Sequence, residues 1–337
     1  MLRDNYNRPL KDLRISVTDR CNFRCTYCMP FDDYEWIDKK EIITFEEIAR
    51  LADLFVQSGV DKIRLTGGEP LLRRDLEKLI SKLSSLSGLK DLCLTTNGSL
   101  LTEKISVLQS AGLSRINVSL DTLNSEKFAR IRRRGDLAKV LEGLFAAKRC
   151  GLHPIKINAV IERGVNDDDI IDLVEFSRKN GFAIRFIEYM DVGNSNNWTS
   201  EKLVSKKEIL DIIDARYPLR EVERDKGSAP SVDYEFIDGQ GEVGVIASVT
   251  EPFCLSCVRA RLTADGKLVT CLFSATGHDL KALLRNAATD GEIIEIISAI
   301  WRKRTDRYSD ERLEAMKSPF GYQATDHKKI EMITLGG

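Results

Sequence analysis

The stretch Cys21-Asn22-Phe23-Arg24-Cys25-Thr26-Tyr27-Cys28-Met29 places three thiols in one short loop, directly after a segment of alternating apolar residues. A Cys-x-x-Cys step lets two sulfurs face one metal centre, as in zinc sites and iron-sulfur clusters. A structural zinc ion takes four protein ligands, so this local trio is one ligand short. A 4Fe-4S cube held by three thiolates keeps one iron open for a substrate or cofactor. The loop alone leaves two interpretations: an open cluster, or half of a zinc site completed from elsewhere.

A second group of three thiols lies far along the chain, at Cys254, Cys257 and Cys271. Two separate trios favour two clusters, each with an open iron, over one site with six thiols. The other two cysteines, Cys93 and Cys150, are expected to be small core residues.

Composition narrows the class of protein. The chain has 337 residues, with 51 Lys and Arg against 52 Asp and Glu, and this balance does not indicate a nucleic-acid or acidic-membrane partner. The sequence has no segment that resembles a signal peptide and no apolar stretch long enough to span a bilayer. We therefore expect a cytoplasmic protein, whose eight cysteines are metal ligands or core residues.

Strand-like and helix-like segments alternate over the first part of the chain. Thr44 and Glu47 form a capping box before the first helical pattern. Such alternation predicts parallel pairing with right-handed crossovers, in an incomplete (β/α) TIM-type barrel. We expect residues 1–190 to form this barrel and residues 191–337 to form a C-terminal region that carries the second trio and closes the barrel. The expected strands, about six, are residues 13–18, 62–66, 91–96, 115–120, 155–160 and 184–190.

One face of these strands is consistently polar. Arg14, Arg64 and Lys156 all lie on that face, opposite apolar residues that would pack on the helices. Burying these cations without anions would be costly, which favours a charged interior that holds an anionic ligand. The alternative is internal ion pairs with Asp121 or Glu188. The sixth strand does not follow the pattern cleanly, because Arg185 and Met190 have opposite parity, as a bulge would produce.

Loops at the strand ends add weaker signals. Gly67-Gly68-Glu69-Pro70 follows the second strand, and its glycines would permit close approach of a ligand to the backbone. Such loops point to the carboxyl end of the strands, where barrel enzymes keep their active sites. By contrast, the basic run Arg132 to Arg134 is expected to be a solvated helix end.

The CxxxCxxC loop together with the GGEP segment resembles the radical S-adenosylmethionine (SAM) superfamily. The match extends to the GTP 3′,8-cyclase family of molybdenum cofactor biosynthesis, through the start at Asp19-Arg20, the CxxC-x13-C trio, the Arg259-x-Arg261 pair and the terminal glycines. The resemblance implies two 4Fe-4S clusters and SAM as cofactors. It also implies cleavage of SAM to a 5′-deoxyadenosyl radical and conversion of GTP to (8S)-3′,8-cyclo-7,8-dihydroguanosine 5′-triphosphate. One departure is Val258, where the family often has Asn.

The family's site residues carry over position by position. The clusters would be held by Cys21, Cys25 and Cys28, and by Cys254, Cys257 and Cys271. SAM would be contacted by Tyr27, Gly68, Ser119 and Met190. GTP would be contacted by Arg14, Arg64, Thr95, Lys156, Arg259 and Arg261. The tail residues Gly336 and Gly337 would reach into the site.

Partners follow from the same resemblance: GTP, an electron donor protein and a downstream pterin-forming enzyme, with the chain a monomer or homodimer. Two other functions remain open at this point. One is a peptide-modifying radical enzyme with an auxiliary cluster, and the other is a zinc-stabilised binding module.

Overall fold

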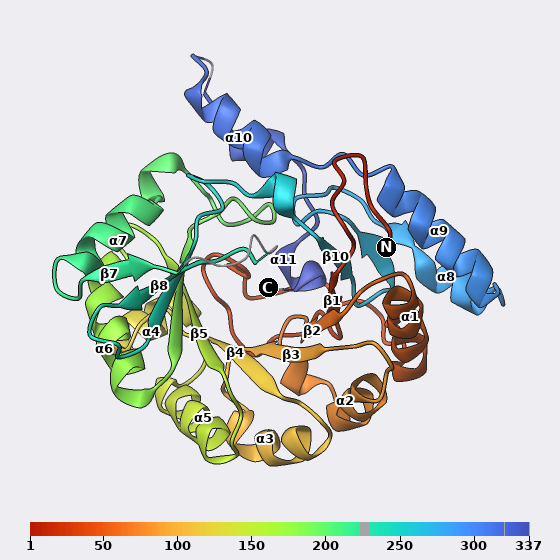
Figure 1. Cartoon of the computed structure of the whole chain (residues 1–337), viewed down its shortest axis with the longest axis horizontal. Helices are drawn as coiled ribbons and strands as arrows, with labels where there is room; N and C mark the ends of the chain where they lie inside the picture. Colours follow the sequence, from red (N-terminus) through yellow and green to blue (C-terminus); the bar gives the residue numbers. More distant parts are fainter. Residues whose placement is uncertain (223–228, 320, 337) are drawn as a thin grey trace.

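The computed structural model describes residues 1–222, 229–319 and 321–336, and its centre is one curved sheet (Figure 1). Across these residues the sheet has twelve strands in the order β12-β11-β10-β1-β2-β3-β4-β5-β6-β9-β8-β7. The strands are β1 Asp12–Ser16, β2 Lys62–Thr66, β3 Asp91–Thr96, β4 Arg115–Ser119, β5 Ile155–Ile161, β6 Ala183–Glu188, β7 Leu219–Glu221, β8 Val232–Phe236, β9 Glu242–Ile246, β10 Arg259–Leu262, β11 Lys267–Val269 and β12 His278–Asp279.

The parallel part of the sheet is wider than the sequence predicts. The expected strands β1 to β6 are present and pair in parallel in chain order. In addition, β10 pairs in parallel with β1, and β9 in parallel with β6, giving eight parallel strands in the described part of the chain. The expected count of about six was too low because β9 and β10 are short and come from the C-terminal region. The two regions therefore share one sheet.

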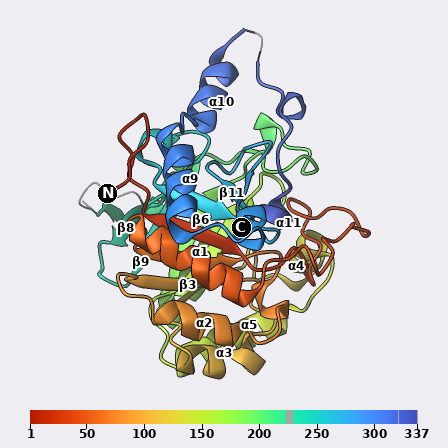
Figure 2. The same ribbon diagram turned by 90° about the vertical axis from the view of Figure 1, so that its right-hand side faces the viewer.

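Helices cover the outer face of the barrel, and the apolar side of each strand packs against them (Figures 1 and 2). The capping box at Thr44 and Glu47 is confirmed. The helices are α1 Phe45–Gln57, α2 Leu76–Ser84, α3 Leu101–Ser110, α4 Ser125–Arg132, α5 Leu137–Arg149, α6 Ile170–Asn180, α7 Lys206–Asp214, α8 Leu280–Arg285, α9 Asp290–Arg302, α10 Tyr308–Lys317 and α11 Met332–Leu335.

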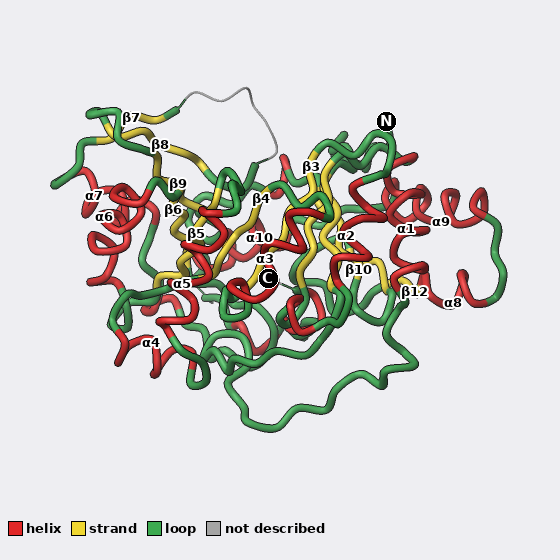
Figure 3. The backbone as a smooth tube through the Cα atoms, turned by 90° about the horizontal axis from the view of Figure 1, so that it is seen from below, coloured by secondary structure: helices red, strands yellow, loops and turns green. Residues whose placement is uncertain are grey.

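The last part of the chain crosses the molecule and ends inside it. Helix α9 packs beside α1, where Arg50 pairs with Asp290 at 2.8 Å. Helix α10 projects away from the barrel, and α11 then returns so that the C-terminal end lies within the ring of strands (Figures 1 and 3). The tail thus occupies the space that the polar strand faces enclose. Among the described helices, none has the length and apolar character needed to cross a membrane.

Candidate active site

The first cysteine loop leaves the carboxyl end of β1 and is held by Arg24 from within the same motif. Its Nη1 donates to the carbonyl oxygens of Cys21 and Phe23, at 2.9 Å each. Its guanidinium also lies 5.6 Å from the ring centroids of Tyr34 and Trp36. Arg24 is buried, so the shape of the loop is fixed by one side chain that satisfies its carbonyls.

The two glycines of the GGEP segment make room for the backbone that leads into this loop. A Cβ on Gly67 would lie 2.5 Å from the carbonyl oxygen of Thr18, and a Cβ on Gly68 only 2.3 Å from that of Arg20. The amide of Gly68 donates to Thr18 at 2.7 Å. The close approach expected from a ligand is therefore made here by the protein's own backbone. Gly68 is not among the residues that line the cavity.

Arg132 is misassigned by sequence reasoning, because it is buried and not solvated. Its Nη1 lies 3.0 Å from the Cys25 sulfur and donates to the Tyr27 hydroxyl at 2.9 Å. Its Nη2 lies 2.7 Å from Oδ2 of Asp121, to which the Tyr27 hydroxyl also donates at 2.9 Å. The positive charge of Arg132 beside the first cysteine loop is therefore compensated by the carboxylate of Asp121. Arg133 and Arg134 pair at the surface with Asp32.

The second cysteine group lies at the opposite end of the strands. Cys254 and Cys257 precede the amino end of β10, and Cys271 follows β11, which runs antiparallel to β10. Burial acts to raise the pKa of Cys257, but Arg259 and Arg304 outweigh it and lower that pKa to about 6. Burial raises the pKa of Cys271 to about 12. The thiolate form is therefore favoured at one thiol of this group.

Four arginines lie between the two cysteine groups, on three neighbouring strands. Arg14 of β1 is directly opposite Arg64 of β2 and Arg261 of β10, and Arg259 also lies on β10. We call these four residues the arginine patch. Burial, followed by Arg64 and then Arg261, holds the pKa of Arg14 well below its ordinary value. Burial and then Arg259 lower the pKa of Arg261 to about 10. Such an arrangement is costly unless an anion compensates it.

The expected internal ion pairs do not neutralise this patch. Asp121 is used by Arg132, and Glu188 accepts the backbone amides of Val249 and Lys206, at 2.7 and 2.8 Å. The buried Nε atoms of Arg14 and Arg64 have no hydrogen-bond partner within the described residues. The geometry favours the anionic-ligand interpretation over the ion-pair interpretation.

One cavity runs from Tyr27 of the first cysteine loop, through the arginine patch, to the second cysteine group; Cys21, Cys25 and Cys28 are not among the residues that line it. It is lined at one end by Tyr27 and Ser119 and at the other by the second cysteine group. Met190 and Arg185 also line it; Met190 lies beyond the end of β6, so it need not follow the alternation of that strand. The expected site residues that line the cavity are Arg14, Tyr27, Arg64, Thr95, Ser119, Met190, Cys254, Cys257, Arg259, Arg261 and Cys271.

One expected residue is absent from the cavity lining, and one residue that was not expected is present. Lys156 does not line the cavity; it is buried and lies 3.9 Å from Glu242. Asn158, two positions on, does line it, and its Oδ1 has no partner in the described part of the chain. Asn158 lies on the same polar face as Lys156, so the alternation pattern could have identified it.

The tail reaches the arginine patch. Arg261 Nη1 donates to the carbonyl oxygen of Gly336 at 2.7 Å. Gly336 has a φ of 74°, and a Cβ there would lie 2.4 Å from Cγ2 of Thr66. Only glycine fits this position without displacement. Gly337 lies outside the described residues.

Each cysteine group is one protein ligand short of a structural zinc site. Among the described residues, no three His, Cys, Asp or Glu side chains converge on a point that could hold one ion. Cluster-type sites also receive hydrogen bonds to sulfur, as Cys25 and Cys257 do here.

Comparison with known families agrees with this geometry. Residues 15–177 match the Radical SAM superfamily, and residues 182–310 match the family described as Molybdenum Cofactor Synthesis C. The chain is 47% identical to the GTP 3′,8-cyclase of Acidothermus cellulolyticus, and the match covers 100% of this chain and 99% of that protein. It is 45% identical to the GTP 3′,8-cyclase of Staphylococcus saprophyticus, with the same coverage.

Solved structures share the fold at much lower identity. Streptococcus suis SuiB bound to S-adenosylmethionine matches with a TM-score of 0.59 and 17% identity, over 85% of this chain and 68% of that chain. The anSMEcpe protein with AdoMet and a Kp18Cys peptide matches with a TM-score of 0.56 and 15% identity, over 97% and 93%. These likenesses concern the fold alone. Identity over its full length shows that the chain belongs to the GTP 3′,8-cyclase family of the radical SAM superfamily.

Proposed function

We propose that this chain is a radical SAM enzyme that converts GTP to (8S)-3′,8-cyclo-7,8-dihydroguanosine 5′-triphosphate, the first step of molybdenum cofactor biosynthesis. The single observation that supports an anionic substrate such as GTP is the arginine patch. The buried Nε atoms of Arg14 and Arg64 in this patch lack partners within the described residues. A triphosphate supplies the negative charge that this patch needs, and guanidinium groups bind phosphate oxygens in pairs.

The cofactor end is assigned to the first cysteine loop. We propose that Cys21, Cys25 and Cys28 hold a 4Fe-4S cluster, with SAM contacted by Tyr27, Gly68, Ser119 and Met190. SAM bound there would supply the radical chemistry by which hydrogen is taken from GTP. The protein's part is orientation and exclusion of water. Tyr27 and Ser119 line the cavity beside this loop, whereas Gly68 would contribute through its backbone.

The substrate end is assigned to the second group and the patch. We propose that Cys254, Cys257 and Cys271 would hold a second 4Fe-4S cluster, which would supply an open coordination position for the guanine. GTP would be contacted by Arg14, Arg64, Thr95, Lys156, Arg259 and Arg261. Lys156 would join only by turning away from Glu242. Fixing the triphosphate at the patch holds the ribose near the first cluster and lowers the entropic part of the barrier.

The wider organisation is part of the same proposal. Residues 1–190 would form the SAM-binding barrel, and residues 191–337 would carry the second cluster and the Gly336-Gly337 tail. The two family matches divide the chain near the same point. We expect a cytoplasmic monomer or homodimer that receives electrons from a donor protein and passes its product to a pterin-forming enzyme.

The direct test is product identification. Anaerobically reconstituted protein is incubated with reductant, SAM and GTP, and the product is identified by mass, with ATP in place of GTP as the control. We expect the cyclised nucleotide from GTP alone. Modification of a peptide, with GTP left unchanged, would support the peptide-modifying alternative instead. Stoichiometric zinc in place of iron would support the zinc-stabilised module.

A further inference from the structure

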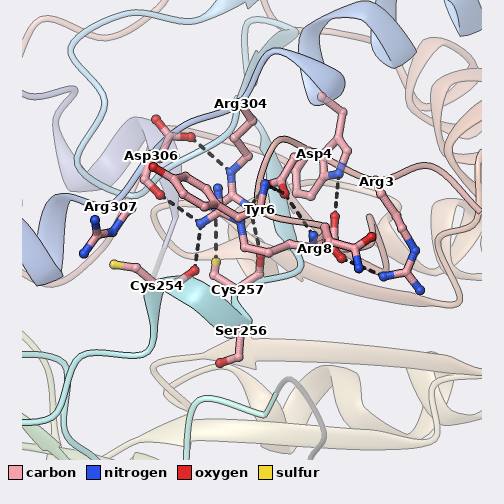
Figure 4. A network of polar contacts seen from close by, with 12 residues as sticks. Arg3, Asp4, Tyr6, Arg8, Cys254, Ser256, Cys257, Arg304, Asp306 and Arg307 are labelled. Atoms are coloured by element: carbon pink, nitrogen blue, oxygen red, sulfur yellow. Dashed lines mark hydrogen bonds and ion pairs between the residues drawn. The ribbon is translucent and has the colours of Figure 1, made fainter.

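The first nine residues fold across the second cysteine loop (Figure 4). Arg8 is 2% exposed, and its Nη1 donates to the carbonyl oxygens of Cys254, at 2.7 Å, and Asp306, at 2.9 Å. The carbonyl oxygen of Arg8 accepts from Nε1 of Trp301 at 3.1 Å. The N-terminal segment therefore ties the second cysteine loop to the chain that follows α9.

Arg304, in that following chain, contacts Cys257 twice. Its Nη1 donates to the Cys257 carbonyl oxygen at 2.8 Å, and its Nη2 lies 3.3 Å from the Cys257 sulfur. Its Nε pairs with Asp306 at 3.0 Å, and its guanidinium lies 4.6 Å from the Trp301 ring. Because one rigid guanidinium contacts both backbone and sulfur, it fixes the direction in which the sulfur points.

The charge of Arg304 is balanced by the N-terminal segment. Asp4 pairs with Arg8 at 2.5 Å and with Arg304 at 3.4 Å, and its side chain is fully buried. Buried charges are tolerated where they are paired, and Asp4 is a partner of both guanidiniums, with Asp306 a second partner of Arg304. Asp4 and Arg304 are far apart in the sequence, and the fold brings this N-terminal segment to the second cysteine loop.

We propose that Arg304, held by Asp4, is a positioning residue for the second cluster that orients Cys257 and raises the reduction potential of that cluster. The inference rests on the proposed function, because it requires a cluster on Cys254, Cys257 and Cys271. Hydrogen bonds to cluster sulfurs set reduction potentials, since a donor stabilises the more negative, reduced state. Arg259 also approaches the Cys257 sulfur, at 3.5 Å, but it belongs to the arginine patch. Arg304 lies outside the patch but also lines the cavity, so its effect on the second cluster is measured in the absence of GTP.

The test is a potentiometric titration of the holoenzyme, followed by electron paramagnetic resonance (EPR). The first cluster is identified by its response to SAM, and the second is the one that does not respond. In Arg304→Gln we expect a more negative midpoint potential for the second cluster and faster loss of its iron to a chelator, with the first cluster unchanged. Arg304→Lys keeps the positive charge but loses the planar guanidinium with its several N–H donors. Its midpoint potential should therefore lie between those of Arg304→Gln and wild type. The control is Arg302→Gln, an exposed residue at the end of α9, which should match wild type.

A second variant guards against failure to fold. Asp4→Asn leaves Arg304 in place and loosens it, so the second cluster should shift in the same direction by a smaller amount. The unchanged first cluster reports that each variant is folded. Wild-type potential and iron loss in both variants, with iron for two clusters present, would overturn this inference and leave the proposed function intact. Iron for a single cluster in the wild type would overturn the second cluster and the inference with it.

Discussion

The two cysteine groups differ in how their surroundings are charged. Beside the first loop, Arg132 is matched by Asp121 and Tyr27, so the protein balances its own charge there. Beside the second, Arg259 and Arg304 approach one sulfur, and the neighbouring patch has buried guanidinium atoms with no partner in the described residues. The charge beside the first loop is thus compensated within the protein, whereas the arginine patch beside the second group needs an anion to compensate it.

The largest effect that separates the two groups is expected from removing one thiol of each. Cys25→Ala should abolish SAM cleavage, because the first cluster is lost. Cys257→Ala should abolish the cyclised product while leaving 5′-deoxyadenosine formation measurable. Each variant should retain about half of the iron, roughly four atoms per chain if each site holds one 4Fe-4S cube. Loss of SAM cleavage in Cys257→Ala to the same extent as in Cys25→Ala would contradict this division.

Removing a patch cation should weaken GTP binding and strengthen the fold. In Arg14→Met we expect GTP affinity to fall by roughly 10- to 100-fold, since a charged hydrogen bond contributes about 1.5–3 kcal/mol. Without GTP, the free energy of unfolding should rise by about 1–2 kcal/mol, because an uncompensated buried charge is removed. Calorimetry with GTP and urea unfolding measure the two effects.

The matched control for Arg14 is Arg115, on β4. Arg115 Nε donates to Asp91 at 2.6 Å, so its charge is compensated within the protein. Arg115→Met should therefore lower the free energy of unfolding and leave GTP affinity unchanged. If Arg14→Met and Arg115→Met destabilise equally, the patch is not an uncompensated site.

Displacing the tail should have a smaller effect on the substrate end. In Gly336→Ala the new methyl group would meet Thr66, and the 2.7 Å contact with Arg261 would be lost. We expect product formation to slow by roughly tenfold, as for the loss of one charged hydrogen bond. Gly181→Ala is the control, because Gly181 also has a positive φ, of 68°, but has open space around it. Equal rates in the two variants would show that the tail contact is irrelevant.

The last effect concerns the support of the first loop, and it changes stability rather than substrate binding or turnover. Burial raises the pKa of Glu69 from 4.5 to about 7, although the Asn97 amide and the Thr96 hydroxyl donate to it, at 2.7 Å each. Because the folded-state pKa lies above the unfolded one, the stability contribution of Glu69 is complete below about pH 4.5 and is lost as the pH rises through 7. Urea unfolding between pH 5 and 8 should show this fall, roughly 1–3 kcal/mol. Glu69→Gln should remove most of this dependence of the free energy of unfolding on pH. The same dependence in that variant would mean that other groups cause it.

Local sequence signals were sufficient for the barrel strands and for the polar face. Strands β1 to β6 are confirmed because each is a short alternating run bounded by turn residues. The same alternation placed Arg14 and Arg64 in the interior, and they do line the cavity.

Contacts between distant segments could not be predicted in this way. The run at Arg132 has the composition of a solvated helix end, and only the folded chain brings Asp121 and Cys25 to it. Arg304 and Asp4 lie almost the whole chain apart and meet because the sheet places β10 beside β1. Burial of these charges depends on tertiary pairing, which carries no periodic signal.

The most direct test of the central claim is EPR of the reduced holoenzyme, titrated separately with SAM and with GTP. The account predicts that SAM changes the signal of the cluster lost in Cys25→Ala, and that GTP changes the signal of the cluster lost in Cys257→Ala. A GTP response that persists in Cys257→Ala and disappears in Cys25→Ala would contradict the assignment of GTP to the second cysteine group.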